Sequence, residues 1–320
     1  MTRKTRTVYA CVIQNDPSTR TKRENLERAS AILEDALANP SRAREHAVGV
    51  VVAPEMFAHR YQLTLEQAHE VAEDGLGERE GECVWWAKKW ARELNAAVAV
   101  GYVQRAGEKL YDAQGVATAD GDVRTYKKTH LYDMDDAWAS ESDEGFKTMT
   151  IEVGTIDDEH AAGRGTITAS PAICMDINPR RFEAPWDAYE LANATLAAKS
   201  DLILFSSAWT NAHPLDALET KRKDVDAEEV LNYWFSRLAP LANTNTYFVC
   251  ANRIGEENDI KYCGCSCVID MRAQRVVAHI DPGMEGALLV PLELDVDVAD
   301  SDDDDHHDDH HTLRRRDFAP

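Results

Sequence analysis

The sequence has no stretch that would carry it into or across a membrane. Its apolar runs are all too short to span a bilayer, and the basic segment 2–7 leads into a short strand rather than into the apolar core of a secretory signal. Basic residues are also few, 35 against 57 acidic ones, and the net charge of −22 excludes the basic surface that nucleic acids require. We therefore expect neither membrane nor nucleic acid as a partner.

Cysteine is scarce and unpatterned. Seven residues, an odd number without framework spacing, indicate reduced thiols and hence a cytosolic or nuclear protein. The segment 2–7 is too short to favour a mitochondrial transit peptide, so we expect a cytoplasmic location. Paired Cys-x-x-Cys ligands are absent, which argues against a zinc site in 263–267, where three cysteines alternate along a predicted strand. No metal or other cofactor is expected.

Internal repeats and linkers between domains are absent as well. A chain of 320 residues can bury a large core, and we expect one domain over residues 1–295. Much of the acidity lies in 300–309, a run of aspartates broken by histidines that cannot contribute to a core. We expect residues 296–320 to form a disordered, solvated tail, and we assign it no function.

Strand and helix patterns alternate along the chain. Short continuous apolar runs predict strands buried on both faces, and longer segments with apolar residues every three or four positions predict helices. The turn at 119–121 joins two strands as a hairpin, so we expect a mixed sheet. The polar segment 130–164 is predicted to be a long loop that shapes a site. The predicted strands are 8–14, 47–53, 96–103, 111–118, 122–127, 167–174, 201–207, 246–252, 267–270, 275–280 and 286–294, and the predicted helices are 21–38, 79–94, 186–200 and 226–242.

Cys174 stands at a bend between a strand and a helix. Ala172 and Ile173 before it continue a buried strand, whereas Asn178 and Pro179 after it break the pattern. A thiol in such a bend lies beside free backbone N–H groups, which stabilise a thiolate or a developing oxyanion. Cys174 is therefore a candidate nucleophile, although a free cysteine taken alone is more often an inert core residue.

Two further polar residues stand at comparable places. Glu55 follows an apolar run, and Lys128 follows the hairpin strand 122–127. The carboxyl ends of the strands in a mostly parallel sheet gather at one edge, where ligands bind, so these two residues and Cys174 can meet. Taken singly, Glu55 is more simply a solvated turn residue and Lys128 a surface charge. Their joint occurrence with a cysteine favours a catalytic site.

Three short blocks carry a resemblance to a known family. They are Val51–Met56, Tyr126–Leu131 and Ala172–Asp176, and in order and spacing they resemble the signature blocks of the nitrilase superfamily of carbon–nitrogen hydrolases, over about residues 7–294. The tail from Val296 onward has no counterpart there. Within the superfamily the chain is most similar to the protein N-terminal asparagine amidohydrolases of fungi, on Tyr126–Asp133, Trp138, Glu144–Phe146, Ile173–Pro179, Phe182–Trp186, Ser207–Asn211 and Cys250–Arg253.

The resemblance implies an α/β fold, a four-layer α-β-β-α sandwich, with a catalytic triad of Glu55, Lys128 and Cys174. It further implies deamidation of an N-terminal Asn or Gln of proteins or peptides to Asp or Glu, through a cysteine thioester. In the N-degron pathway that product is arginylated and then destroyed through ubiquitin. Relatives in the superfamily often form homodimers by stacking two sandwiches.

The chemistry of an amide fits these residues. An amide is a poor electrophile, so a thiolate nucleophile needs a base to form it and a donor to hold the oxyanion. By resemblance, Glu55 takes the proton of Cys174, passes it to the departing ammonia and later activates water. We expect Lys128 and the backbone N–H of Met175 to hold the oxyanion, and the lysine charge to lower the pKa of the thiol.

Several other residues complete the expected site. By resemblance a second glutamate orients the lysine, with Glu141 the first choice and Glu144 the second. A substrate with a free α-ammonium calls for a carboxylate, and the nearest candidate is Asp176, for which a structural role is the alternative. Candidates for the walls of the pocket are Trp138, Trp209 and Asn211.

Two alternatives stay open. A member of the superfamily could act on a free small molecule, as ω-amidases and carbamoyl-amino-acid hydrolases do. A chain that kept the fold could also bind N-termini without catalysis, although the joint presence of all three triad residues argues against this. The sequence does not determine the preference between Asn and Gln, the oligomeric state or the role of the tail.

Overall fold

The computed structural model of the chain describes residues 2–38, 48–74, 81–157, 161–211 and 225–299. In these ranges no helix is long and apolar enough to cross a membrane. The helices are α1 (Lys22–Ala38), α2 (Leu65–Val71), α3 (Glu82–Leu94), α4 (Glu190–Ala198) and α5 (Ala227–Arg237). The strands are β1 (Thr2–Gln14), β2 (Val48–Val52), β3 (Ala97–Ala106), β4 (Lys109–Ala117), β5 (Val123–Lys127), β6 (Met149–Ile156), β7 (Ala162–Ile173), β8 (Leu202–Ser207), β9 (Tyr247–Asn252), β10 (Ile254–Glu257), β11 (Ile260–Cys263), β12 (Cys267–Asp270), β13 (Arg275–His279) and β14 (Gly286–Val298).

Most of the strands belong to one connected, mixed sheet. Its order is β13-β12-β9-β8-β7-β14-β1-β2-β3-β4-β5, with β6 attached to β1 and β7, while β10 and β11 form a separate hairpin. The strand β2 runs parallel to β1 and β3, and β8 runs parallel to β7 and β9. The carboxyl ends of β2, β7 and β8 therefore come before loops that can share one site.

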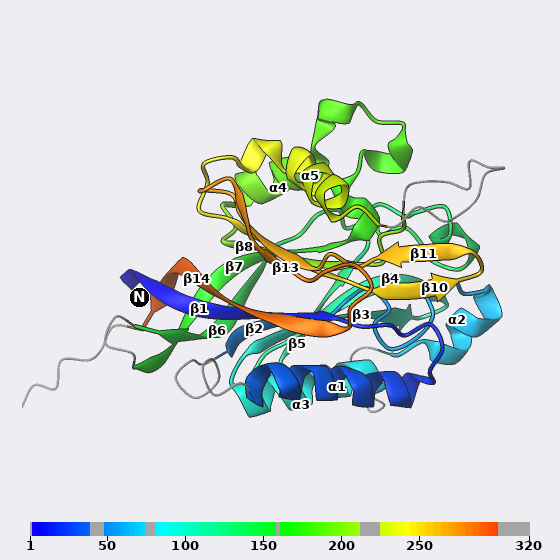
Figure 1. Cartoon of the computed structure of the whole chain (residues 1–320), viewed down its shortest axis with the longest axis horizontal. Helices are drawn as coiled ribbons and strands as arrows, with labels where there is room; N and C mark the ends of the chain where they lie inside the picture. Colours follow the sequence, from blue (N-terminus) through cyan, green and yellow to red (C-terminus); the bar gives the residue numbers. More distant parts are fainter. Residues whose placement is uncertain (1, 39–47, 75–80, 158–160, 212–224, 300–320) are drawn as a thin grey trace, which may run out of the picture.

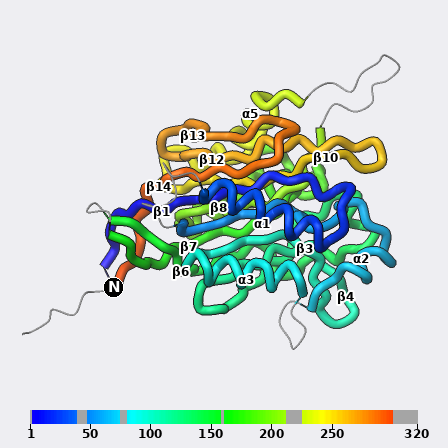
Figure 2. The backbone as a smooth tube through the Cα atoms, turned by 60° about the horizontal axis from the view of Figure 1, so that its bottom comes forward, coloured from blue at the N-terminus to red at the C-terminus, as the bar shows by residue number. Residues whose placement is uncertain are grey.

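The strands form two stacked halves, and each half is covered by helices on its outer face. Figure 1 shows α4 and α5 on one side of the strands and α1 and α3 on the other, and Figure 2 shows α1 and α3 side by side. Alternate residues of a strand face different layers. Val50 faces the core between the halves and Val51 faces α1 and α3, whereas Leu204 faces the central core and Phe205 faces α4 and α5. This is the expected four-layer sandwich.

The polar segment 130–164 is not a loop throughout, as the sequence suggested. It contains β6 and the first residues of β7, which pair antiparallel from Met149↔Ala169 to Ile156↔Ala162. In β6 the buried Ile151 and Val153 alternate with the more exposed Thr150 and Glu152. This short alternation was hidden because the residues on both sides of it are polar.

Two further expectations are corrected. The segment 263–267 is not one strand, because β11 ends at Cys263, β12 begins at Cys267, and Gly264 and Cys265 between them have φ of 64° and 60°. The predicted domain boundary at residue 295 falls inside β14, which pairs with β1 as far as Thr2↔Val298. The tail from residue 300 onward lies outside the described residues.

The two halves are joined by hydrogen bonds close to the ends of β2 and β8. The Ser206 hydroxyl donates to the carbonyl of Ala53 at 2.8 Å and accepts from the side-chain amide of Gln114 at 2.7 Å. All three residues are fully buried, so these bonds form in a low-dielectric interior. They hold the segment after β2 next to the segment after β8, and thus Glu55 next to Ala208.

Candidate active site

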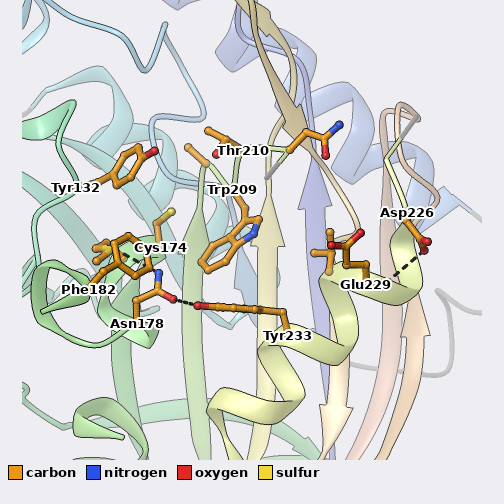
Figure 3. Close-up of a pocket in the computed structure, with 13 residues that line it drawn as sticks. Tyr132, Cys174, Asn178, Phe182, Trp209, Thr210, Asp226, Glu229 and Tyr233 are labelled. Atoms are coloured by element: carbon orange, nitrogen blue, oxygen red, sulfur yellow. Dashed lines mark hydrogen bonds between the residues drawn. The ribbon is translucent and has the colours of Figure 1, made fainter. Parts of the chain in front are cut away.

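Cys174 is the first residue after β7 and begins a short 3₁₀ turn, Cys174–Ile177. Its φ is 39°, in the left-handed region that a residue with a side chain rarely adopts. Such a conformation costs about 1–3 kcal/mol and persists only where the surroundings hold it. The side chain is 7% exposed, and its sulfur points into the space between Tyr132 and Trp209 (Figure 3).

The carboxylate of Asp176 holds this turn in place. One oxygen accepts from the backbone N–H groups of Thr129 at 3.0 Å and His130 at 2.8 Å. The other accepts from the N–H of Ile173 and from the hydroxyl of Tyr126, both at 2.8 Å. Three of these bonds connect the turn that carries the candidate nucleophile to β5 and the residues after it, and the bond from Ile173 closes the turn itself.

Asp176 therefore does not have the expected role of meeting a substrate ammonium. It is fully buried, and each of its oxygens already accepts two hydrogen bonds. The physical reason is its place inside the turn, where its carboxylate satisfies backbone donors.

We predict that Asp176→Asn lowers the free energy of unfolding by about 1–3 kcal/mol, because the amide NH₂ would face backbone donors in place of an acceptor. Activity should fall by the same factor on a peptide and on a small amide without an ammonium group. Urea unfolding and ammonia release on both substrates would test this, and a selective loss on the peptide alone would restore the recognition role.

Glu55 lies just beyond β2, in a turn that depends on close approach of β3. The following residue, Met56, has φ of 51°. A Cβ on Gly101 would stand 2.6 Å from the Cα of Glu55 and 2.7 Å from the carbonyl oxygen of Pro54. Glycine at this position of β3 is thus what lets the Glu55 turn pack against the sheet.

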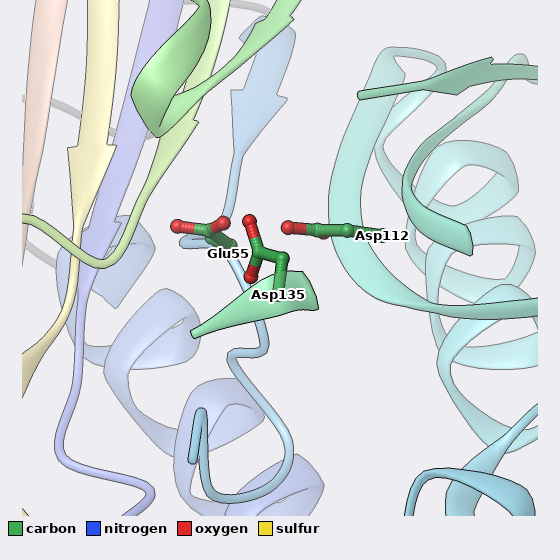
Figure 4. A group of neighbouring side chains, drawn as sticks. All are labelled: Glu55, Asp112 and Asp135. Carbon is green, nitrogen blue, oxygen red and sulfur yellow. The ribbon is translucent and has the colours of Figure 1, made fainter. Parts of the chain in front are cut away.

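The ammonium of Lys128 lies among three buried carboxylates. Its Nζ donates to Glu55 Oε1 at 2.6 Å, to Asp135 Oδ2 at 2.7 Å and to Asp112 Oδ2 at 2.9 Å. The other oxygen of Glu55 accepts from the backbone N–H of Ala208 at 2.6 Å. Figure 4 shows the three carboxylates converging from separate segments. A divalent cation would suit such a trio, but the lysine ammonium occupies the space among them.

The charges in this cluster act on one another. Burial lowers the pKa of Lys128, but the three carboxylates outweigh it and hold that pKa well above its usual value. Burial raises the pKa of Asp112 well above the ordinary range, and that of Asp135 in the same direction, against the attraction of the ammonium. Lys128 is therefore charged at neutral pH.

The thiol of Cys174 is protonated at rest. Burial and then the carboxylate of Glu55 raise its pKa well above the usual value, and the opposing charge of Lys128 does not compensate. The charge of Lys128 lowers the pKa of the thiol, as expected, but burial and Glu55 outweigh this effect. A base must remove the thiol proton when the substrate is present.

A cavity of about 380 Å³ opens beside the sulfur. Two of the expected wall residues, Trp209 and Asn211, line it, and so does Met175, whose N–H was expected to hold the oxyanion. The hydroxyl of Tyr233, on α5, donates to the side-chain oxygen of Asn178 at 2.6 Å and fixes one side of the space (Figure 3). The described residues lining it are Tyr132, Cys174, Met175, Asn178, Phe182, Ala208, Trp209, Thr210, Asn211, Asp226, Glu229, Val230 and Tyr233.

Three other expected residues lie elsewhere. Trp138 is buried in a cluster with Met56 and Tyr61 and does not line this cavity. Glu141 accepts two hydrogen bonds from the guanidinium of Arg180, at 3.0 and 2.9 Å. Glu144 pairs with Lys127 and Lys147. Neither glutamate contacts Lys128, because each has a cation of its own closer to the surface.

The carboxylates that do hold the lysine, Asp112 and Asp135, were not foreseen. Asp112 had a usable signal, since it is a charged residue within the fully buried part of β4. Asp135 had none, because it is one of several aspartates in an acidic segment. In the fold Asp135 is held in place by two hydrogen bonds that it accepts, from the hydroxyl of Tyr61 at 2.8 Å and from the N–H of Tyr132 at 2.9 Å.

Known proteins share this fold and sequence pattern. The family model described as carbon-nitrogen hydrolase matches residues 10–299. The protein N-terminal amidase of Schizosaccharomyces pombe is 26% identical over 256 residues, which is 73% of this chain and 82% of that protein. Two solved structures of N-terminal amidase, one with an Asn-Glu and one with a Gln-Val peptide, each have a TM-score of 0.79, with 17% and 18% identity, and cover 92% of this chain and 100% of theirs. The family read from the three blocks is confirmed, and the chain belongs to the carbon–nitrogen hydrolases.

Proposed function

We propose that this chain removes the side-chain amide from an N-terminal Asn or Gln of peptides and proteins, and so supplies the N-degron pathway with Asp or Glu. The observation that carries the proposal is the position of the Cys174 thiol, in a strained turn at the edge of a cavity and close enough to Glu55 and Lys128 for both to change its pKa. A relative with 82% coverage of its length is named for this activity.

The first half of the reaction forms a thioester. Glu55 accepts the Sγ proton as the sulfur of Cys174 adds to the amide carbon. The intermediate then collapses with loss of the nitrogen, which receives the proton from Glu55 and departs as ammonia. The carbon–nitrogen bond is broken and a carbon–sulfur bond has formed, so Glu55 is again ionised.

The second half releases the acid. Glu55 accepts a proton from water as the water oxygen adds to the thioester carbon. Glu55 then returns the proton to the sulfur of Cys174 as the carbon–sulfur bond breaks. The product carries a carboxyl group in place of the amide, and both Cys174 and Glu55 are back in their starting states.

The developing oxyanion in both halves needs stabilisation. The N–H of Met175 lies in the first turn of the 3₁₀ helix, where such groups have no acceptor within the helix. Lys128 contributes through its charge, because its three N–H donors are already engaged by Glu55, Asp112 and Asp135.

Recognition of a free N-terminus requires a carboxylate at the cavity, and we propose Glu229 for it. Among the described lining residues only Asp226 and Glu229 carry carboxylates. One oxygen of Asp226 accepts from the N–H groups of Glu228 and Glu229 and so caps α5. Glu229 projects from the first turn of the same helix into the space beside Trp209 (Figure 3).

We predict that Glu229→Gln raises the KM for an Asn-initiated peptide by about tenfold to a hundredfold, as expected for loss of a charged hydrogen bond. Glu228→Gln, on the same helix turn but not in the cavity lining, is the matched control and should leave KM unchanged. Equal KM values for the two variants would remove Glu229 from the recognition role.

Ammonia release from three substrates tests the function itself. The substrates are an Asn-initiated peptide, its N-acetylated copy and free asparagine. Activity on the first alone supports the proposal, whereas activity on free asparagine would favour an enzyme of small-molecule metabolism and activity on none a binding protein. The homodimer and the cytoplasmic location stay predictions, which light scattering and microscopy of a tagged chain would test.

A further inference from the structure

The buried cluster around Lys128 has an imbalance of charge. If Glu55, Asp112 and Asp135 were all ionised, three negative charges would face one positive charge, and all four side chains are fully or almost fully buried. Excess charge in a low-dielectric interior is removed most readily by taking up a proton. We propose that Asp112 holds that proton at neutral pH, as a neutral positioning residue that keeps Glu55 ionised.

The number of donors decides which carboxyl group is neutral. Glu55 accepts from Lys128 and from the N–H of Ala208, one bond at each oxygen. Asp135 accepts three bonds, from Lys128, the hydroxyl of Tyr61 and the N–H of Tyr132. These donors stabilise the ionised form of both groups.

Asp112 has much less support for a negative charge. Among the described residues its Oδ2 accepts from Lys128 alone, in the longest of the three bonds at 2.9 Å, and its buried Oδ1 has no hydrogen-bond partner there. Carboxylate oxygens of all three acids lie within 4.8 Å of one another, so a proton on Asp112 lies close to neighbouring negative charge. Burial has the largest effect on the pKa of Asp112 and raises it; Lys128 lowers that pKa, and Glu55 and Asp135 raise it further.

The proton on Asp112 has a consequence for catalysis, which rests on the proposed role of Glu55 as the base. Without the proton on Asp112, the excess negative charge of the cluster would favour protonation of Glu55 before the substrate arrives. With it, the resting cluster carries one net negative charge, which disappears when Glu55 accepts the thiol proton. Asp112 thus keeps the base available while its Oδ2 fixes the lysine.

Linkage between stability and pH tests the proposal without any substrate. If Asp112 is protonated in the folded chain and ionised in the unfolded chain, folding takes up one proton, and stability falls as the pH rises. Asp112→Asn removes that proton. The unfolding constant of the wild type, divided by that of Asp112→Asn, should therefore rise about tenfold per pH unit between about pH 6 and pH 8. A ratio that stays flat for Asp112→Asn over this range would overturn the proposal.

A second measurement uses the unaltered protein and covers the case in which Asp112→Asn does not fold. The infrared spectrum of the folded full chain, labelled with ¹³C in aspartate carboxyl groups, should contain a protonated-carboxyl band at neutral pH that shifts in D₂O. Absence of the band would overturn the proposal. Because neither measurement involves turnover, failure of the N-terminal amidase proposal would leave both results interpretable.

Discussion

Replacing Cys174 with alanine should abolish ammonia release, with a fall in kcat of at least about 10⁴-fold, because the proposed thioester can then no longer form. The fold should persist, since alanine removes only the sulfur from a residue of the central core. Alanine also retains the unfavourable φ of 39°, so stability should not rise greatly. Ammonia release from the Asn-initiated peptide measures the loss of activity, and circular dichroism shows whether the fold persists.

The matched control is Cys11→Ala. Cys11 is also buried, in β1 beneath the helices, and burial raises its pKa to about 12, so it is chemically inert. The control should retain activity, at a modest cost in stability from the lost packing. Residual turnover in the Cys174 variant that matched the control would mean that another group is the nucleophile.

Replacing Lys128 with methionine should remove activity and also destabilise the fold by about 3–5 kcal/mol, the usual consequence of leaving buried charges without their partner. Glu55, Asp112 and Asp135 would then lack the one counter-charge that they share among the described residues. The measurement is the free energy of unfolding by urea.

The loss in the Lys128 variant should depend on pH. Without the ammonium, the buried carboxyl groups have pKa values above those of the unfolded chain, so the folded state binds more protons and gains stability as the pH falls. The difference in free energy of unfolding between the wild type and the Lys128 variant should therefore become smaller as the pH is lowered from about 8 to about 5. A deficit that grew over this range would contradict the charge balance inferred for the cluster.

Lys127→Met is the control for this variant. Lys127 precedes Lys128 in the chain but points toward the surface, where it pairs with Glu144 at 3.4 Å and lies over the ring of Tyr111. Such exposed interactions contribute about 0–1 kcal/mol, so the control should stay close to the wild type in stability. Equal losses in the two variants would mean that the buried cluster is not what Lys128 stabilises.

The three proposed catalytic residues could be placed together from the sequence for a physical reason. Glu55 and Cys174 follow apolar runs that read as buried strands, and Lys128 follows a hairpin strand recognisable by its turn. The carboxyl ends of parallel strands lie along the same side of a sheet, so residues that directly follow such strands are expected to be near one another. Their neighbourhood was therefore predictable before any coordinates.

The groups that surround the triad were less predictable. Nothing local distinguishes Asp135 from Glu141, since both lie in the same acidic segment, and the difference arises from distant partners. Asp135 accepts hydrogen bonds from the hydroxyl of Tyr61 and the backbone N–H of Tyr132 in the interior, whereas Glu141 accepts from Arg180 near the surface. The local sequence around an acidic residue does not show which distant residues will contact it in the fold.

The pairing of β1 with β14 has a consequence for synthesis in the cell. These strands lie next to each other near the middle of the sheet order, yet they are separated by almost all of the described chain. A ribosome delivers the amino-terminal residues first, so β1 leaves the exit tunnel long before its antiparallel neighbour exists. The edge of β1 that faces β14 must stay unpaired until translation reaches the final strand, and contacts so remote in sequence form slowly. During elongation the growing chain therefore exposes an unpaired strand edge, the kind of surface at which aggregation begins.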